Sequence, residues 1–206
     1  MPANKSQHFV PRCYLRAFCA DGDGAAINVF NMSRERAIDA APAKGQCAKP
    51  YFYGRDGELE RALQEPEGQY AEIMRRVVDD PHAATSADAR TLHSFMLLQS
   101  YRSAAWIEGE IRLAEAEREL LAADAVPELL EALVITHEMA LELALGAFRN
   151  SIDSTAHLET RLVLNCTAVP FITSDDPVIY TNRFHIQKDV LGGRASPVPV
   201  PCLPCR

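Results

Sequence analysis

Long apolar runs are missing from this sequence of 206 residues. Stretches such as Met96-Leu97-Leu98 fall far below the roughly 18 residues that are needed to span a bilayer. No apolar stretch of the kind found in signal peptides follows Lys5. From these two absences we expect a soluble, cytoplasmic protein that has no contact with a membrane.

Several common catalytic motifs are missing as well. The sequence has no glycine-rich phosphate loop, no Gly-x-Ser-x-Gly nucleophile turn and no His-Glu-x-x-His zinc motif. The six cysteines are predicted to be reduced thiols. Cys202 and Cys205 have the spacing of metal ligands, but a zinc ribbon needs a second pair and the sequence has none, so we assign this pair no function.

Basic residues are too few for a protein that holds nucleic acid on a broad basic surface. The formal net charge is −7 at pH 7, from 21 Lys and Arg against 28 Asp and Glu. Residues 1–55 nevertheless hold eight basic and four acidic residues, so they carry +4 and the remainder carries −11. This asymmetry indicates either a basic N-terminal segment packed on an acidic helical body or an anion-binding face.

The sequence does have the composition of a globular domain, with 48% apolar, 24% charged and 7% aromatic residues. We predict a single domain over residues 1–206. The C-terminal segment, residues 190–206, is rich in proline and is predicted to be irregular and truncated.

Extended segments are predicted near both ends of the chain. Residues 7–10 are expected to lead into a short helix with Pro11 at its first position. Alternating or short apolar runs predict strands further along the chain. These strands cover residues 26–30, 51–53, 161–165, 171–173 and 177–180.

Between these ends the hydrophobic pattern has a helical period. One helix is predicted over residues 57–80, and Pro66 is expected to kink or divide it. Thr85 offers an N-cap for the longest predicted helix, which runs towards Leu121, and a further helix is predicted over 128–148. The predicted fold class is α+β, with long helices packed on a small sheet from the N- and C-terminal segments.

Two polar residues lie on the apolar stripe of the longest predicted helix. Gln99 and Arg102 continue the spacing of Leu92 and Phe95, so both are expected to point into the core. A buried guanidinium without a partner is costly, so Arg102 must meet a carboxylate, a bound anion or water. A structural ion pair explains this residue as well as a binding site does.

Three carboxylates and a histidine complete the candidate site. Glu60 and Glu67 are seven residues apart, which places them on the same side of one helix if Pro66 does not rotate the register, and a solvated helix surface is the alternative for both. Asp175 follows a predicted strand, where catalytic carboxylates often lie, although a turn explains this aspartate equally well. His8 precedes the first helix, at a point that favours anions, and a structural histidine is the alternative.

Four motifs occur in order along the chain. They are Gln7-His8-Phe9-Val10-Pro11-x-x-Tyr14-Leu15-x-x-Phe18, Glu60-x-x-Leu63-x-x-x-Glu67, Gln99-x-x-Arg102 and Phe171-Ile172-Thr173-Ser174-Asp175-x-Pro177. On these motifs, residues 7–181 resemble the bacterial domain-of-unknown-function family 4238. The resemblance implies no established activity. It implies that the recurring polar positions of the family are His8, Glu60, Glu67, Gln99, Arg102 and Asp175.

One function that fits these residues is a divalent-metal-dependent nuclease or phosphodiesterase acting on nucleic acid or another phosphate ester. The ligands of Mg²⁺ or Mn²⁺ would be Glu60, Glu67 and Asp175. His8 would act as general acid and base, Arg102 would steady the scissile phosphate, and Gln99 would be the third catalytic residue.

The other function that stays open is a non-catalytic binding protein. In that case the same residues form a buried polar network, and the acidic helices meet a protein partner. Geometry separates the two hypotheses. Oxygen atoms that converge at about 2.0–2.6 Å from one ion favour the enzyme, whereas polar groups that saturate one another favour the binding protein.

Overall fold

The computed structural model of the chain describes residues 4–20, 22–123, 125–181 and 198–201. Its strands form three separate antiparallel pairs, two from the N-terminal segment and one from the C-terminal segment. The pairs are β1 (Ser6–His8) with β4 (Ala48–Pro50), β2 (Ala26–Asn31) with β3 (Arg36–Pro42), and β5 (Val178–Thr181) with β6 (Val198–Pro201). The α+β class is confirmed, and both ends of the chain supply strands.

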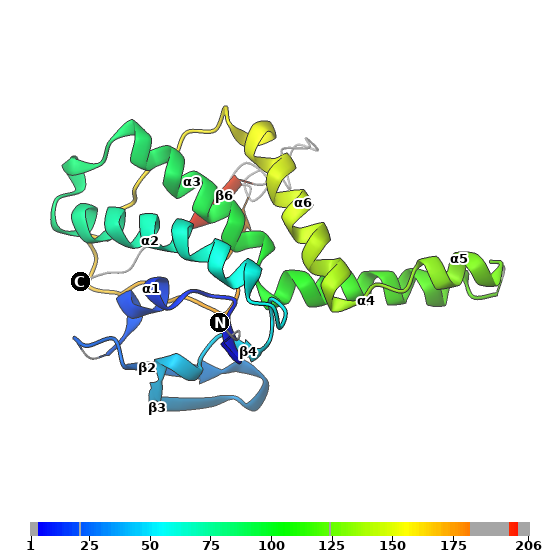
Figure 1. Cartoon of the computed structure of the whole chain (residues 1–206). Coiled ribbons are helices and arrows are strands. Elements are labelled where there is room, and N and C mark those ends of the chain that lie inside the picture. Colours follow the sequence, from blue (N-terminus) through cyan, green and yellow to red (C-terminus); the bar gives the residue numbers. More distant parts are fainter. Residues whose placement is uncertain (1–3, 21, 124, 182–197, 202–206) are drawn as a thin grey trace, which may run out of the picture.

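Helices form most of the chain between these strands (Figure 1). The α-helices are α1 (Arg12–Leu15), α2 (Glu58–Asp79), α3 (Ser86–Tyr101), α4 (Ala104–Leu121), α5 (Pro127–Ala132) and α6 (His137–Thr155). Short 3₁₀ helices are η1 (Arg16–Phe18), η2 (Met32–Arg34), η3 (Ala43–Gly45) and η4 (Pro81–Ala83). In the part of the chain that the structure describes, no helix has both the length and the apolar character needed to cross a membrane.

The longest predicted helix is in fact two helices, α3 and α4, so this prediction is wrong. Arg102 ends α3 with φ −89° and ψ 0°, and Ser103 leaves helical geometry with ψ 151°. The Ser103 hydroxyl accepts a hydrogen bond from the Trp106 N–H at 3.2 Å and caps α4. The apolar spacing continues across this break, which is why periodicity did not reveal it. Gln99 and Arg102 still point into the core, as predicted.

The helix predicted over residues 128–148 is also divided, into α5 and α6. Thr136 starts the second of these helices, because its hydroxyl accepts a hydrogen bond from the Met139 N–H at 3.2 Å. In contrast, α2 runs continuously through Pro66, so the predicted division of that helix is wrong. Leu63 and Tyr70 are buried on either side of the proline, and their packing holds the helix together past the missing hydrogen bond.

Several predicted strands are wrong as well. Residues 161–165 and 171–173 are irregular, and 51–53 form a turn in which Tyr51 has a φ of +53°. The Gly54 N–H closes this turn on the Tyr51 carbonyl at 3.0 Å. Pro11 is the N-cap of α1 rather than its first residue. Of the tail predicted as irregular, residues 190–206, the structure describes only 198–201, and these form strand β6, so the prediction is wrong there. The Cys202 and Cys205 pair lies outside the described residues.

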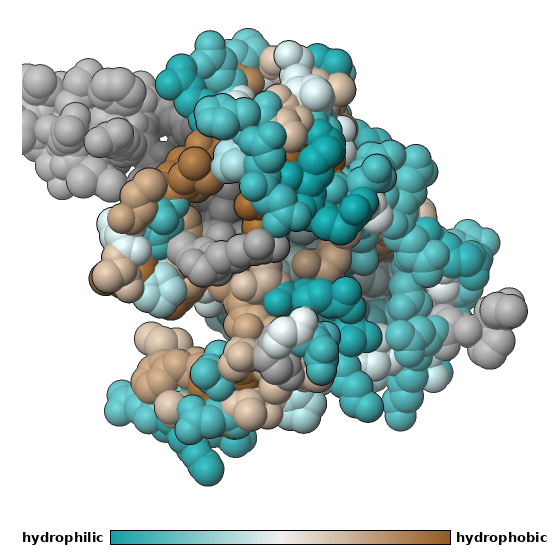
Figure 2. All heavy atoms as spheres, turned by 90° about the vertical axis from the view of Figure 1, so that its left-hand side faces the viewer, coloured by the Kyte–Doolittle hydropathy of each residue, from teal (hydrophilic) through white to brown (hydrophobic). Residues whose placement is uncertain are grey.

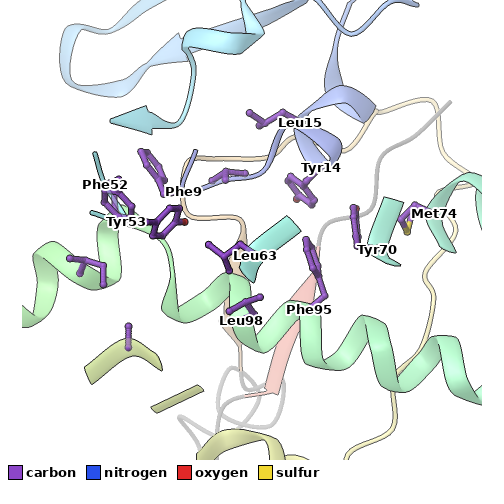
Figure 3. Packing of buried hydrophobic residues seen from close by; sticks show 14 of the residues in the cluster. Phe9, Tyr14, Leu15, Phe52, Tyr53, Leu63, Tyr70, Met74, Phe95 and Leu98 are labelled. Carbon is purple, nitrogen blue, oxygen red and sulfur yellow. The ribbon is translucent and has the colours of Figure 1, made fainter. Parts of the chain in front are cut away.

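An apolar core joins the N-terminal segment to α2 and α3, and Figure 3 shows its aromatic rings together. The Tyr70 and Phe95 rings stack with centroids 4.1 Å apart, and the Tyr14 ring lies 6.2 Å from that of Tyr70. The Tyr14 hydroxyl and the Thr173 Oγ1 are hydrogen-bonded at 2.9 Å. The first and last sequence motifs are therefore in contact, although 159 residues separate these two side chains.

Two parts of the structure extend beyond this core. The β2–β3 hairpin lies at the lower end of the molecule, where brown and tan residues appear beside teal ones (Figures 1 and 2). It exposes Phe30, Met32 and Ile38. On the right of Figure 1, the end of α4 and α5 project away from the body, whereas α6 starts at the body, where His137 Nε2 and the Phe52 carbonyl are hydrogen-bonded at 2.8 Å. We call residues 104–143 the acidic arm.

Candidate functional site

Arg102 lies where α3, α2 and β1 meet, and only 4% of its surface is exposed. Its Nη2 donates hydrogen bonds to Glu67 Oε1 at 2.8 Å and to the His8 carbonyl at 2.9 Å. Its Nε donates to the Tyr53 hydroxyl at 2.8 Å. Burial opposes the charge of Arg102, but the contacts with Tyr53 and Glu67 outweigh it and raise its pKa. The prediction that Arg102 is buried and meets a carboxylate is confirmed.

The end of β1 explains why polar side chains gather here. Buried carbonyl groups need donors, and those of His8 and Phe9 receive them from neighbouring elements. The Tyr53 hydroxyl donates to the His8 carbonyl at 3.2 Å, in addition to the bond from Arg102. Gln99 Nε2 donates to the Phe9 carbonyl at 2.8 Å. Gln99 and Arg102, one turn apart on α3, therefore bind two consecutive carbonyls of the N-terminal segment.

Gln7 joins the same strand to α2 and is fully buried. Its Oε1 accepts a hydrogen bond from the Tyr53 N–H at 2.6 Å, and its Nε2 donates to the Gly54 carbonyl at 3.0 Å and to Glu60 Oε2 at 3.3 Å. Glu60 and Glu67 thus face the same region from one helix, as their spacing predicted, but each has its own partner. We define the Arg102 network as Gln7, His8, Tyr53, Glu60, Glu67, Gln99 and Arg102.

The His8 side chain is half-buried in an environment that disfavours its charge. Burial lowers its pKa below the ordinary value near 6.5, and the charge of Arg12 lowers it further. The Lys44 carbonyl and the Glu67 carboxylate oppose this change without reversing it. His8 is therefore a neutral imidazole at pH 7, which is the form that can accept a proton.

Three buried polar atoms of the network have no hydrogen-bond partner among the described residues. They are His8 Nε2, Gln99 Oε1 and Arg102 Nη1. A cavity of about 10 Å³ borders Arg102 and Tyr53. That volume is about what one water molecule needs, so a phosphate group does not fit beside Arg102 in this conformation.

Asp175 lies apart from the network. Its side chain is exposed. Burial, and to a smaller extent the negative charge of Asp175, raises the pKa of the Cys47 thiol to about 12. The Cys47 carbonyl accepts a hydrogen bond from the Phe9 N–H at 2.9 Å. Asp175 therefore lies close to the chain that pairs with the N-terminal segment, and among the described residues no hydrogen bond or ion pair joins it to the His8 side chain or to Arg102.

The predicted Mg²⁺ or Mn²⁺ site is not formed by these residues. Within the described ranges, no three His, Cys, Asp or Glu side chains gather in a way that could hold a metal ion. The physical reason is that the three carboxylates have different surroundings and do not converge. Glu67 pairs with Arg102, Glu60 accepts from Gln7, and Asp175 is exposed. The residues present do not fit a three-carboxylate metal centre.

Two central members of the network were missed by the sequence reasoning. Gln7 stands in the first motif, but a lone glutamine on a short strand gives no signal that it is buried. Tyr53 belongs to an aromatic run, 51–53, that was interpreted as a strand. A positive φ at Tyr51 turns the chain there and brings the Tyr53 hydroxyl to Arg102, and sequence periodicity does not report such a turn.

Comparison with known proteins gives one family. The family model described as "Protein of unknown function (DUF4238)" matches residues 6–201, so the chain belongs to this family. The search of curated proteins found no match. The search of solved structures found none either.

Proposed function

We propose that this protein is a non-catalytic interaction protein, in which the Arg102 network is structural and the acidic arm meets a protein partner. The network supports this proposal because Gln7, Gln99 and Arg102 direct their hydrogen bonds to groups of their own chain. The cavity of about 10 Å³ beside Arg102 is also far smaller than a phosphate ester.

The observation that carries the proposal is the surface of the acidic arm. Large hydrophobic side chains that gather on a protruding element mark interaction sites. On the arm, between 39% and 83% of each of the following side chains is exposed: Leu113, Leu120, Leu121, Val126, Leu129, Val134, Met139 and Leu143. Residues 104–143 also contain ten acidic and two basic residues, so the arm carries −8 in a chain whose total is −7.

The charge of the arm indicates the chemistry of its partner. Two acidic arms repel each other, whereas a basic surface is attracted and steered to the arm. The exposed leucines additionally need an apolar face to cover them. A basic amphipathic helix satisfies both requirements, because it presents apolar residues on one side and Lys or Arg on the other.

The test uses a fluorescent peptide of about 15 residues with Leu and Lys at helical spacing, and a matched peptide with Glu in place of Lys. The fluorescence anisotropy should rise when the protein is added to the Lys peptide, and it should not rise with the Glu peptide. Leu120→Ser combined with Leu129→Ser should weaken binding at least about tenfold, which is about 1.4 kcal/mol. The matched control is Ile172→Ser, at an exposed apolar residue outside the arm. Absence of binding, or an equal effect of both variants, would overturn the proposal.

A second candidate function is phosphodiester hydrolysis. It is favoured by His8 Nε2 and Arg102 Nη1, which have no hydrogen-bond partner within the described ranges. A neutral His8 can act as a general base, and a free guanidinium nitrogen can donate to a phosphate oxygen. The network would have to open for a substrate to reach these atoms. This candidate therefore depends on a conformation other than the closed one.

Hydrolysis of single-stranded DNA and of bis(p-nitrophenyl) phosphate, with Mn²⁺ and with a chelator, tests the second candidate. Activity that persists in chelator and disappears in His8→Gln supports it. Activity that needs Mn²⁺ and disappears in Asp175→Asn would instead restore the three-carboxylate hypothesis. If neither substrate is hydrolysed under either condition, and Mn²⁺ does not raise the melting temperature, both enzyme hypotheses are excluded.

A further inference from the structure

A second cavity, separate from the one beside Arg102, lies between α2, α3 and the C-terminal segment. It has a volume of about 40 Å³, several times the roughly 10–15 Å³ that one water needs. Its lining is almost entirely apolar, and the residues that decide its chemistry are Tyr14, Tyr70, Phe95, Gln99, Leu162 and Val178.

One wall of this cavity is aromatic. The Tyr70 and Phe95 rings are stacked with an interplanar angle of 13°, and Tyr14 lies beside them (Figure 3). Flat rings of this kind offer a large dispersion surface to another ring. Leu162 and Val178, which also line the cavity, come from the C-terminal segment. A cavity with such walls favours a neutral, flat and apolar occupant over an ion or a sugar.

The polar residues of this lining are Gln99, Thr160 and Arg161, and of these only Gln99 is buried. Arg161 is exposed and pairs with Glu159. Gln99 is 2% exposed, and its Nε2 is held by the Phe9 carbonyl at 2.8 Å. This bond fixes the orientation of the amide, so Oε1 is the atom of the amide that is left to accept a hydrogen bond from a ligand. Gln99 Oε1 is buried and has no hydrogen-bond partner among the described residues. A buried acceptor without a donor is costly, and a ligand that brings a donor relieves this cost.

We propose that this cavity binds a small neutral aromatic molecule with a single hydrogen-bond donor, a phenol or an indole, whose O–H or N–H donates to Gln99 Oε1. The ring stacks in the space next to Tyr70 and Phe95, and the donor satisfies the free acceptor. The inference does not depend on the acidic arm, because the arm and the cavity share no residue.

The experiment titrates the whole protein with phenol and with toluene, followed by ¹H–¹⁵N NMR and isothermal titration calorimetry. A purely apolar cavity prefers toluene, because phenol must give up its hydrogen bonds to water. Because the phenol O–H can donate to Gln99 Oε1, phenol should bind at least as tightly as toluene. Toluene binding more tightly by about fivefold, the factor for one missing hydrogen bond of about 1 kcal/mol, would overturn the role of Gln99.

Two matched variants locate the site. Leu162→Trp fills the cavity and should weaken phenol binding at least tenfold, whereas Leu164→Trp, at an exposed position two residues later, should leave binding unchanged. Intermolecular nuclear Overhauser effects from phenol to the Tyr70 and Phe95 rings provide a readout in the unmodified protein, independent of how the variants fold. Binding that both tryptophans affect equally, the absence of these effects, or no binding by either compound would overturn the proposal.

Discussion

Arg102 Nη2 lies 2.8 Å from Glu67 Oε1 and 2.9 Å from the His8 carbonyl, so one nitrogen connects α3 to both α2 and β1. The pair is asymmetric, since 4% of the Arg102 side chain is exposed against 27% of the Glu67 side chain. The Arg102 guanidinium has therefore lost nearly all of its contact with water, whereas the Glu67 carboxylate keeps some. This arrangement makes Arg102 a connector of elements that are far apart in sequence.

The first prediction is that Arg102→Met destabilises the fold by about 3 kcal/mol. The variant leaves the Glu67 carboxylate and the His8 carbonyl without this partner, and broken buried pairs cost about 3–5 kcal/mol, with partial hydration of Glu67 placing the effect at the lower end. Urea unfolding followed by circular dichroism measures the change. Arg112→Met is the control, because the pair of Arg112 with Glu108 is exposed and should contribute less than about 0.5 kcal/mol. Equal effects would contradict the structural role of Arg102.

How much of this site the sequence predicts depends on the kind of contact. The spacing of Gln99 and Arg102 correctly placed both side chains in the core, and the seven-residue spacing correctly placed Glu60 and Glu67 on one side of α2. Helical periodicity is a local property, so residues a few turns apart suffice to reveal it. The α+β class followed in the same way from the change between strand and helix patterns.

Partners and breaks could not be predicted in this way. The spacing does not show that Arg102 forms an ion pair with Glu67 or that Gln7 donates a hydrogen bond to Glu60. These pairings depend on how β1 packs against two helices. The break at Ser103 was missed since the apolar stripe continues across it. β3 was missed because six of its seven residues are exposed, so it has no apolar alternation to recognise.

The second prediction concerns the break between α3 and α4. Ser103 is fully buried and caps α4 through its hydroxyl, so Ser103→Ala should destabilise the protein by about 1 kcal/mol. The change is read from the urea midpoint. Ser94→Ala, inside α3, removes a hydroxyl of the same size that caps no helix and should change stability by no more than about 0.5 kcal/mol. A smaller loss in Ser103→Ala than in the control would argue against the cap.

A third prediction follows from Asp88 at the start of α3. Hydrogen bonds from Arg76 and Thr85 hold its pKa far below the ordinary value. A carboxyl group with a lowered pKa in the folded state contributes stability above its unfolded pKa near 3.9 and loses it as pH falls towards the folded pKa. Asp88→Asn should therefore lower the melting temperature at pH 6, and the difference from the unmodified protein should shrink between about pH 4 and pH 2. A difference that stays constant over this range would contradict the ionised role.

The last prediction concerns the protonation of His8. Burial lowers its pKa in the folded protein, with smaller contributions from Arg12 and Arg102, while the unfolded chain keeps a value near 6.5. Below pH 6.5 the unfolded state binds the proton more readily, so His8 contributes to stability above pH 6.5, and this contribution is lost as pH falls through the folded pKa.

The imidazole resonances of His8 in ¹H–¹³C NMR should titrate below pH 6.5. In Glu67→Gln the titration should move to still lower pH, because the Glu67 carboxylate opposes the lowering of this pKa. The control is Glu115→Gln, which removes one charge from the acidic arm and should leave the titration in place. A His8 pKa at or above 6.5 would mean that burial does not disfavour the charged form of the imidazole. The closed Arg102 network would then be the wrong description of this site.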